Sequence, residues 1–149
     1  AYVPQGNLLF SGTVLDNLTI VKPEATEEEI RQAVFVSCMD EFVQKLPDGL
    51  HTVLGESGTG LSEGQAQRIA IARALVRKAT VMLLDEVTSA LDYATEQRVL
   101  KQLMRRGITC ILATHRLSVL SMCDHAYRVR EGRVELLTGE ELANLIAFE

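Results

Sequence analysis

The stretch Val81-Met82-Leu83-Leu84-Asp85-Glu86 joins four apolar residues to two acids. An apolar run without polar interruption is typical of a strand buried on both faces, as in a parallel sheet. Residues 93–105 follow with apolar positions at helical spacing, and residues 108–113 form a second apolar run. A strand, a helix and a strand in this order predict a parallel α/β unit with a right-handed crossover. The helix would begin after the cap Asp92 and bury four side chains: Val99, Leu100, Leu103 and Met104.

Capping boxes predict where three further helices begin. In each box a Ser or Thr is followed three residues later by Glu or Gln, and each side chain bonds the other residue's backbone N–H. The pairs are Thr26 with Glu29, Ser62 with Gln65, and Thr138 with Glu141. The second box opens a helix of about 16 residues. A short helix over residues 39–45 and a hairpin across Glu131-Gly132 complete the expected elements.

Composition narrows the classes of function. The formal net charge is −5 and Lys and Arg form no long block, which argues against a nucleic-acid groove. No apolar run approaches the ~20 residues of a membrane-spanning helix, so a membrane role would come through a partner. Three cysteines without C-x-x-C spacing are expected to be core residues in a reducing compartment rather than metal ligands: Cys38, Cys110 and Cys123.

Two carboxylates follow the first apolar strand. In open α/β sheets, ligands bind beyond the carboxyl ends of the strands, which is where Asp85 and Glu86 are expected to lie. An Asp at this position can hold Mg²⁺ with its water shell, and an adjacent Glu can polarise an attacking water. The alternative interpretation of the pair is a turn or a helix cap after the strand.

Two other places could contact a phosphate. His115 follows the second strand and would reach the same edge of the sheet, although a lone His is more often an ordinary surface or core residue. Ser62 and Gly64 stand at a helix N-terminus, where a hydroxyl, exposed N–H groups and the positive end of the macrodipole favour a phosphate. Plain N-capping is the alternative interpretation there.

The joint order of these segments is more informative than any one of them. Five of them resemble motifs of the ATP-binding-cassette (ABC) ATPase family. LSEGQ at 61–65 resembles the signature motif, and QRIAIARAL at 67–75 resembles the helix that follows it. VMLLDE at 81–86 resembles the Walker B strand, SALD at 89–92 the D-loop, and His115 the switch histidine. Gln5 falls at the position of the Q-loop glutamine. The resemblance covers essentially the whole chain.

The resemblance implies a fold and a chemistry. The fold would be α/β, a partial P-loop NTPase core with mainly parallel strands, the family's helical subdomain, and a C-terminal β-hairpin and helix. Asp85 would help to hold Mg²⁺ and Glu86 would be the catalytic base of ATP hydrolysis. His115 would sense the γ-phosphate, and Gln5 would touch Mg²⁺ or the attacking water.

The resemblance also implies partners. Family members work as head-to-tail dimers, so Ser62, Gly64 and Gln65 would bind the ATP held by the opposite subunit. Asp92 would contact the dimer seam. The parent protein would carry a transmembrane domain and act at the cytoplasmic face of the cell membrane, without binding nucleic acid.

A subtype and a division of the chain follow from the same resemblance. Residues 10–18 and 52–58 are similar to exporter-type domains fused to membrane helices, in which the stretch around Glu56 meets the intracellular loops. Residues 1–5 would be the end of a core strand with the Q-loop, residues 6–66 the helical subdomain with the signature motif, and residues 67–149 the remainder of the core.

Two departures from the family pattern stand out. Glu63 replaces the usual Gly and is expected to point away from the nucleotide. No G-x-x-x-x-G-K-[ST] occurs, because Leu61 follows the Gly-rich residues 55–60 where Lys would be needed. The resemblance therefore implies a truncation that leaves the phosphate cradle before Ala1, so that this piece alone does not hydrolyse ATP. An open sheet edge would then favour a homo-oligomer.

Two alternatives share the fold. One is a non-hydrolysing or regulatory ABC fragment, which the intact Glu86 and His115 of the parent protein speak against. The other is an ABC ATPase of DNA maintenance, which the compact spacing and the charge of −5 disfavour. The identity of any transported substrate is not encoded in these motifs.

Overall fold

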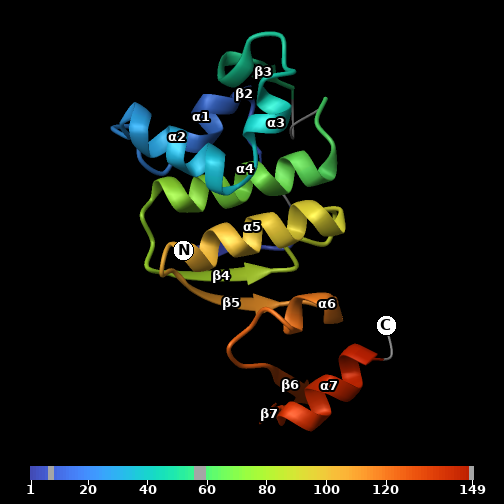
Figure 1. The fold of residues 1–149 in the computed structure, drawn as a ribbon. Helices are drawn as coiled ribbons and strands as arrows, with labels where there is room; N and C mark the ends of the chain where they lie inside the picture. The colour runs from blue at the N-terminus through green and yellow to red at the C-terminus, as the bar shows by residue number, and fades with distance from the viewer. Residues whose placement is uncertain (7–8, 56–59, 148–149) are drawn as a thin grey trace. The chain divides into compact units, whose positions relative to one another are not determined.

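The parallel sheet consists of β1 (Tyr2–Val3), β4 (Val81–Asp85) and β5 (Thr109–Ala113), in the spatial order β1-β4-β5. The structure, a computed structural model, describes residues 1–6, 9–55 and 60–147. Helix α5 (Tyr93–Arg105) connects β4 to β5, and Asp92 caps it as predicted. Both pairings are parallel, and all five residues of β4 pair with β5. The predicted parallel α/β unit is therefore confirmed (Figure 1).

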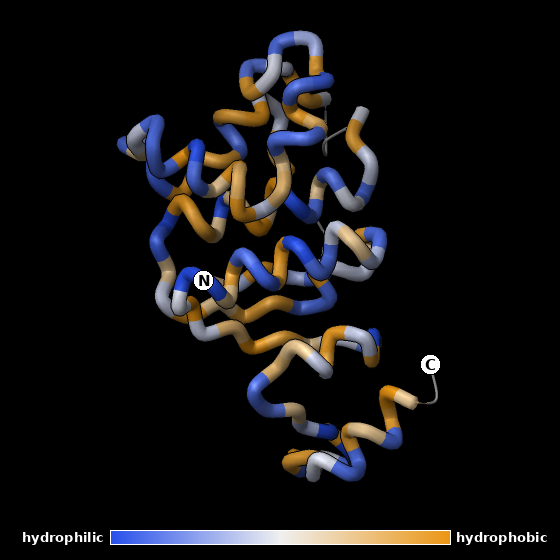
Figure 2. Tube along the Cα trace, in the orientation of Figure 1, coloured by the Kyte–Doolittle hydropathy of each residue, from blue (hydrophilic) through white to orange (hydrophobic). Residues whose placement is uncertain are grey.

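One prediction about this sheet is wrong. The strand β4 alternates in burial: Met82 and Leu84 are buried, whereas Val81 and Leu83 are 45% and 42% exposed. Helices α4 and α5 contact β1 and β5, and Figure 1 shows both helices on the same side of the strands. The apolar run, orange in Figure 2, therefore has helices of its own unit against one face instead of two.

Helix α5 buries most of the residues that its periodicity predicts. Val99, Leu100 and Leu103 are buried, but Met104 is 47% exposed and is a second correction. A buried stripe on a helix covers only part of its circumference, and Met104 lies just outside that stripe. Of the cysteines, Cys38 is buried as expected, whereas Cys110 and Cys123 are only partly buried.

A helical layer packs around α4. Its other elements, in chain order, are β2 (Gly12–Thr13), α1 (Val14–Thr19), α2 (Glu27–Val36), α3 (Asp40–Val43), the 3-10 helix η1 (Gly49–His51) and β3 (Val53–Leu54). Helix α4 (Glu63–Val76) has 14 residues, close to the predicted length, and contacts both α1 and α2. The core of the layer includes Leu18, Met39, Ile69 and Val76.

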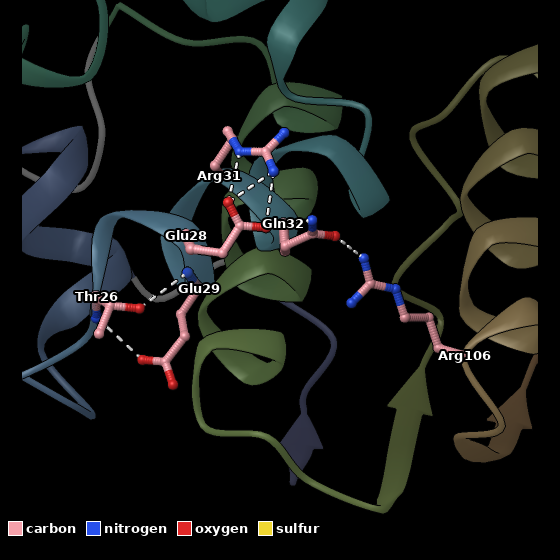
Figure 3. A network of polar contacts seen from close by, with 6 residues as sticks. All are labelled: Thr26, Glu28, Glu29, Arg31, Gln32 and Arg106. Carbon is pink, nitrogen blue, oxygen red and sulfur yellow. Dashed lines mark hydrogen bonds and ion pairs between the residues drawn. The ribbon is translucent and has the colours of Figure 1, made fainter.

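Polar contacts tie α2 to its neighbours. The predicted capping box is present, with the Thr26 hydroxyl accepting from the Glu29 N–H and the Glu29 carboxylate accepting from the Thr26 N–H. Glu28 accepts hydrogen bonds from Arg31 and Gln32, and Arg106 at the end of α5 donates to Gln32 (Figure 3). The hydrogen bond from Arg106 to Gln32 joins α2 to the C-terminal end of α5.

The contacts of Glu29 in α2 can be tested through the pH dependence of the protein's stability. Hydrogen bonds from Lys22 (2.8 Å) and Lys78 (2.6 Å), with the N–H of Thr26, lower the pKa of Glu29 from 4.5 to about 2. A lowered folded-state pKa contributes stability that is present above the unfolded pKa and lost as pH falls through the folded one. We expect Glu29→Gln to lower the melting temperature at neutral pH and to flatten its fall between pH 4.5 and about pH 2. Thermal denaturation across this range measures both effects, and equal slopes in the two proteins would contradict them.

Residues after β5 form a second compact unit, Thr114–Glu149. It contains α6 (Leu117–Leu120), the antiparallel pair β6 (Tyr127–Arg130) and β7 (Arg133–Leu136), and α7 (Gly139–Ala147). Glu131 and Gly132 have φ values of 50° and 74°, as the two central residues of a type I′ hairpin require. Thr138 and Glu141 form the predicted capping box. The predicted hairpin and final helix are confirmed.

Among residues 1–6, 9–55 and 60–147, no helix combines the length and the apolar character that crossing a membrane requires.

Candidate functional site

The acid pair lies at the carboxyl end of β4, as predicted. Asp85 is the last residue of the strand, and the N–H of Glu86 extends the ladder by donating to the Ala113 carbonyl at 2.9 Å. Glu86 has a φ of 49°, in the left-handed region that residues other than Gly rarely occupy. Such strain is concentrated at functional sites because the surrounding structure must hold it. The chain therefore turns sharply at the residue that carries the candidate base.

Side chains from the β1 segment meet this pair. The amide Nε2 of Gln5 donates to Oε2 of Glu86 at 3.1 Å, and the hydroxyl of Tyr2 donates to Oδ2 of Asp85 at 3.2 Å. Because β1 and β4 run parallel, the residues at their carboxyl ends reach the same edge of the sheet. The structure thus brings Gln5 to the adjacent pair Asp85 and Glu86, from which it is 80 and 81 residues away in the sequence.

Tyr2 is a neighbour of the site that the motifs did not single out. Loss of solvent, followed by the hydrogen bond and the charge of Asp85, raises the pKa of the Tyr2 hydroxyl. The hydroxyl therefore stays protonated near neutral pH and remains a donor to the carboxylate. The signal in the sequence is weak, because it is only the position of an aromatic residue three places before Gln5.

The donor set at this edge suits a hard cation. Asp85 supplies a carboxylate and Gln5 supplies an amide oxygen, both of which are ligands that Mg²⁺ accepts. Mg²⁺ binds through one or two carboxylates and keeps several waters or substrate oxygens, so it does not need a closed cage of protein ligands. The residues present fit such an ion.

The N-terminus of α4 carries the second predicted group. Ser62 caps the helix, with its Oγ accepting from the Gln65 N–H at 3.2 Å and its N–H donating to Gln65 Oε1 at 2.9 Å. Gly64 packs against the loop after β4, where an added Cβ would lie 2.8 Å from the Ala90 carbonyl oxygen. Glu63 is exposed in the first turn. Capping is therefore one role of Ser62 and Gln65, and close packing is one role of Gly64.

Gln67 is a further residue that the motifs did not single out for a role. It is buried, with 4% of its surface exposed, and both the nitrogen and the oxygen of its side-chain amide form hydrogen bonds with the loop after β4. A glutamine inside an apolar helical stripe is the only sequence signal, and that signal does not identify a partner.

The remaining predicted residues lie on other parts of the chain. Asp92 caps α5, with its two carboxylate oxygens accepting from the N–H (3.0 Å) and the hydroxyl (2.7 Å) of Thr95, and these bonds lower its pKa. His115 is exposed in the second unit, two residues after the end of β5. The stretch around Glu56 lies outside the described residues.

Comparison with known proteins decides the family. The model of the family described as "ABC transporter" matches residues 1–89, more than half of the chain. This chain belongs to the ABC transporter family. ABC transporter ATM1 of Toxoplasma gondii is 43% identical over 143 residues, which are 94% of this chain and 13% of that protein. Multidrug resistance protein homolog 65 of Drosophila melanogaster is 43% identical over 136 residues, 90% of this chain and 10% of that protein.

A solved structure agrees with this assignment. The structure of a bacterial Atm1-family ABC exporter with ATP bound matches with a TM-score of 0.90 and 34% sequence identity, covering 99% of this chain and 27% of that one. The fold class and the family predicted from the order of the motifs are confirmed. The chain spans between 10% and 27% of the length of these three ABC proteins.

Proposed function

We propose that this chain supplies the hydrolytic residues and the signature motif of an ATP-driven ABC exporter. The observation that carries the proposal is the contact of Gln5 with Glu86, directly beside Asp85 at the carboxyl edge of the sheet. A carboxylate that is positioned by a neighbouring amide can accept a proton from an attacking water. Glu86 is then the general base, and Gln5 orients its carboxylate.

Mg²⁺ bound at this edge would be held by Asp85 and Gln5, and it would supply neutralisation of the phosphate charge that develops during transfer. The hydroxyl of Tyr2 donates to Oδ2 of Asp85 at 3.2 Å. This hydrogen bond orients the carboxylate and leaves its other oxygen, Oδ1, for the ion. The roles of these residues are positioning and charge placement, as in phosphoryl transfer generally.

The nucleotide itself is proposed to bind between two copies of the domain. Ser62 and Gly64 lie at the positive end of α4, which favours an anion, and the Ser62 hydroxyl can donate while it accepts from Gln65. Together with Gln65 they would contact the ATP of the opposite subunit in a head-to-tail dimer, and Asp92 would lie at the seam. His115 would contact the γ-phosphate.

The exporter assignment extends to partners and place. The named relatives are transporters, and we infer a transmembrane domain in the parent protein with this domain on the cytoplasmic side of the membrane. Residues 1–5 and 67–149 are assigned to the ATPase core, and residues 6–66 to the helical subdomain. In isolation the chain is proposed to self-associate, because Tyr2, Leu83 and Ile111 expose an apolar sheet face at 60%, 42% and 59%.

Asp85→Asn tests the proposal through its dependence on magnesium. In the intact transporter, the Mg²⁺ concentration for half-maximal ATP hydrolysis should rise at least about tenfold. Removal of a residue that only hydrogen-bonds a metal ligand already lowers metal affinity by about tenfold or more, and Asp85→Asn changes the ligand itself. A Mg²⁺ titration of phosphate release measures it, with Asp48→Asn, an exposed acid in the helical layer, as the control. An unchanged Mg²⁺ dependence in Asp85→Asn would contradict the proposal.

A further inference from the structure

The two segments that hold Ser62 and Glu86 are joined by one buried side chain. Gln67 lies one turn into α4, where its Oε1 accepts from the Ala90 N–H at 3.1 Å and its Nε2 donates to the Ser89 hydroxyl at 3.0 Å. Because the nitrogen and the oxygen of one amide bond two consecutive residues, they constrain both the position and the orientation of the loop that carries Ser89 and Ala90. Gln67 itself is only 4% exposed and both hydrogen bonds are partly buried, so leaving either atom of its amide without a partner would cost free energy.

A second contact holds the same two segments together. Gly64 lies three residues before Gln67 and therefore on the same face of α4. A Cβ at Gly64 would be 2.8 Å from the Ala90 carbonyl oxygen and 3.3 Å from the Leu91 side chain. The helix backbone at Gly64 and the loop backbone at Ala90 are therefore too close to admit a side chain at position 64.

The loop is short and closed on itself between this contact and Glu86. The Ser89 N–H donates to the Glu86 carbonyl at 3.1 Å, and the Leu91 N–H donates to the Thr88 carbonyl at 3.0 Å. Thr88 is buried, so the turn is anchored on its inner side. Because these hydrogen bonds link Ala90 to Glu86 through two successive turns, we expect a displacement of Ala90 to displace Glu86 as well.

We propose that Gln67 is a positioning residue that makes the N-terminal turn of α4 and the loop 86–91 move as one unit. Contact of a phosphate with Ser62 would then also set the place of the Glu86 carboxylate in the same subunit. The significance of this coupling for turnover rests on the proposed function, whereas the coupling itself is a property of these two segments. Gln67 acts on the reaction only through Glu86 and Ser62.

Two substitutions separate the coupling from the packing. Gln67→Leu keeps much of the volume and removes both hydrogen bonds, whereas Gln67→Glu keeps an acceptor for the Ala90 N–H. The control is Ser37→Ala, because Ser37 is also buried and its hydroxyl donates to the Ala33 and Val34 carbonyls of its own helical turn. Hydrogen exchange of backbone amides is followed in the intact transporter, with and without a non-hydrolysable ATP analogue.

In Gln67→Leu, the amide of Ala90 should exchange roughly tenfold faster, since its N–H loses the partner that protects it. The analogue should slow exchange in both 61–66 and 86–91 of the wild-type protein, but only in 61–66 of Gln67→Leu. Gln67→Glu should restore part of the response of 86–91, and Ser37→Ala should retain all of it. A response of 86–91 that persists in Gln67→Leu, or that is lost equally in Ser37→Ala, would overturn the proposal.

The same experiment distinguishes a failure of the proposed function. If the analogue leaves both segments of the wild-type protein unchanged, the assignment of Ser62 to nucleotide contact fails. The coupling is then decided by exchange without nucleotide, where Gln67→Leu must accelerate 61–66 together with 86–91. Acceleration of the loop alone would overturn the coupling.

Discussion

Glu86→Gln in the intact transporter is expected to lower the rate of ATP hydrolysis by about 10²–10⁴-fold, the range in which a positioned general base contributes. The amide has the size of the carboxylate but cannot accept a proton from water. In the wild-type protein Gln5 Nε2 donates to Glu86 Oε2 at 3.1 Å, and the amide oxygen of the variant can accept the same hydrogen bond. The loss should therefore appear in kcat, with ATP binding retained. Steady-state phosphate release and equilibrium binding of ATP measure the two quantities separately.

A matched acid serves as the control for Glu86→Gln. Glu140 is exposed in the first turn of α7, so Glu140→Gln removes one negative charge from the second unit. Its kcat should equal that of the wild-type protein. Normal turnover in Glu86→Gln would assign the base to another residue, and loss of binding together with turnover would make Glu86 a structural residue.

Gly64→Ala is expected to have the second-largest effect, because it acts on packing and on the candidate site together. The new Cβ would lie 2.8 Å from the Ala90 carbonyl oxygen, closer than real contacts allow, so the loop must shift. Overpacking of this kind costs about 1–3 kcal/mol of the free energy of unfolding. We expect a melting temperature lowered by several degrees and a loss of ATP hydrolysis, measured by thermal denaturation and phosphate release.

Gly139 provides the comparison for that substitution. It opens α7, and an added Cβ there would have no atom of the described residues within 4 Å. Gly139→Ala should keep or slightly raise the melting temperature, because Ala loses less conformational freedom than Gly in a helix. Equal melting temperatures for Gly64→Ala and the wild-type protein would show that α4 and the loop have room to separate.

Local rules predicted most of the secondary structure. Each of the three capping boxes depends on residues three apart, and all three are present. The hairpin at Glu131 and Gly132 is of the same kind. The burial of β4 was not predictable in this way, since it depends on which faces of the sheet other elements cover. Val81 and Leu83 are apolar but exposed for that reason.

The candidate site shows the same division. The order of the motifs predicted that Gln5, Asp85 and Glu86 serve one site, and parallel strands bring their ends together. The hydrogen bond of Tyr2 to Asp85 and the double contact of Gln67 depend on tertiary placement, which no local pattern encodes. The left-handed backbone of Glu86 was likewise invisible, because Glu has no local preference for that conformation.

We infer that this chain holds the hydrolytic residues of an ATP site whose phosphate cradle is formed by other residues of the intact transporter. It is tested most directly by phosphate release from Mg-ATP, measured for the intact transporter beside the 149-residue chain alone. We expect turnover by the intact transporter and none by the chain, in which no G-x-x-x-x-G-K-[ST] occurs. Hydrolysis by the chain alone, or an intact protein that binds Mg-ATP without hydrolysing it, would contradict the account.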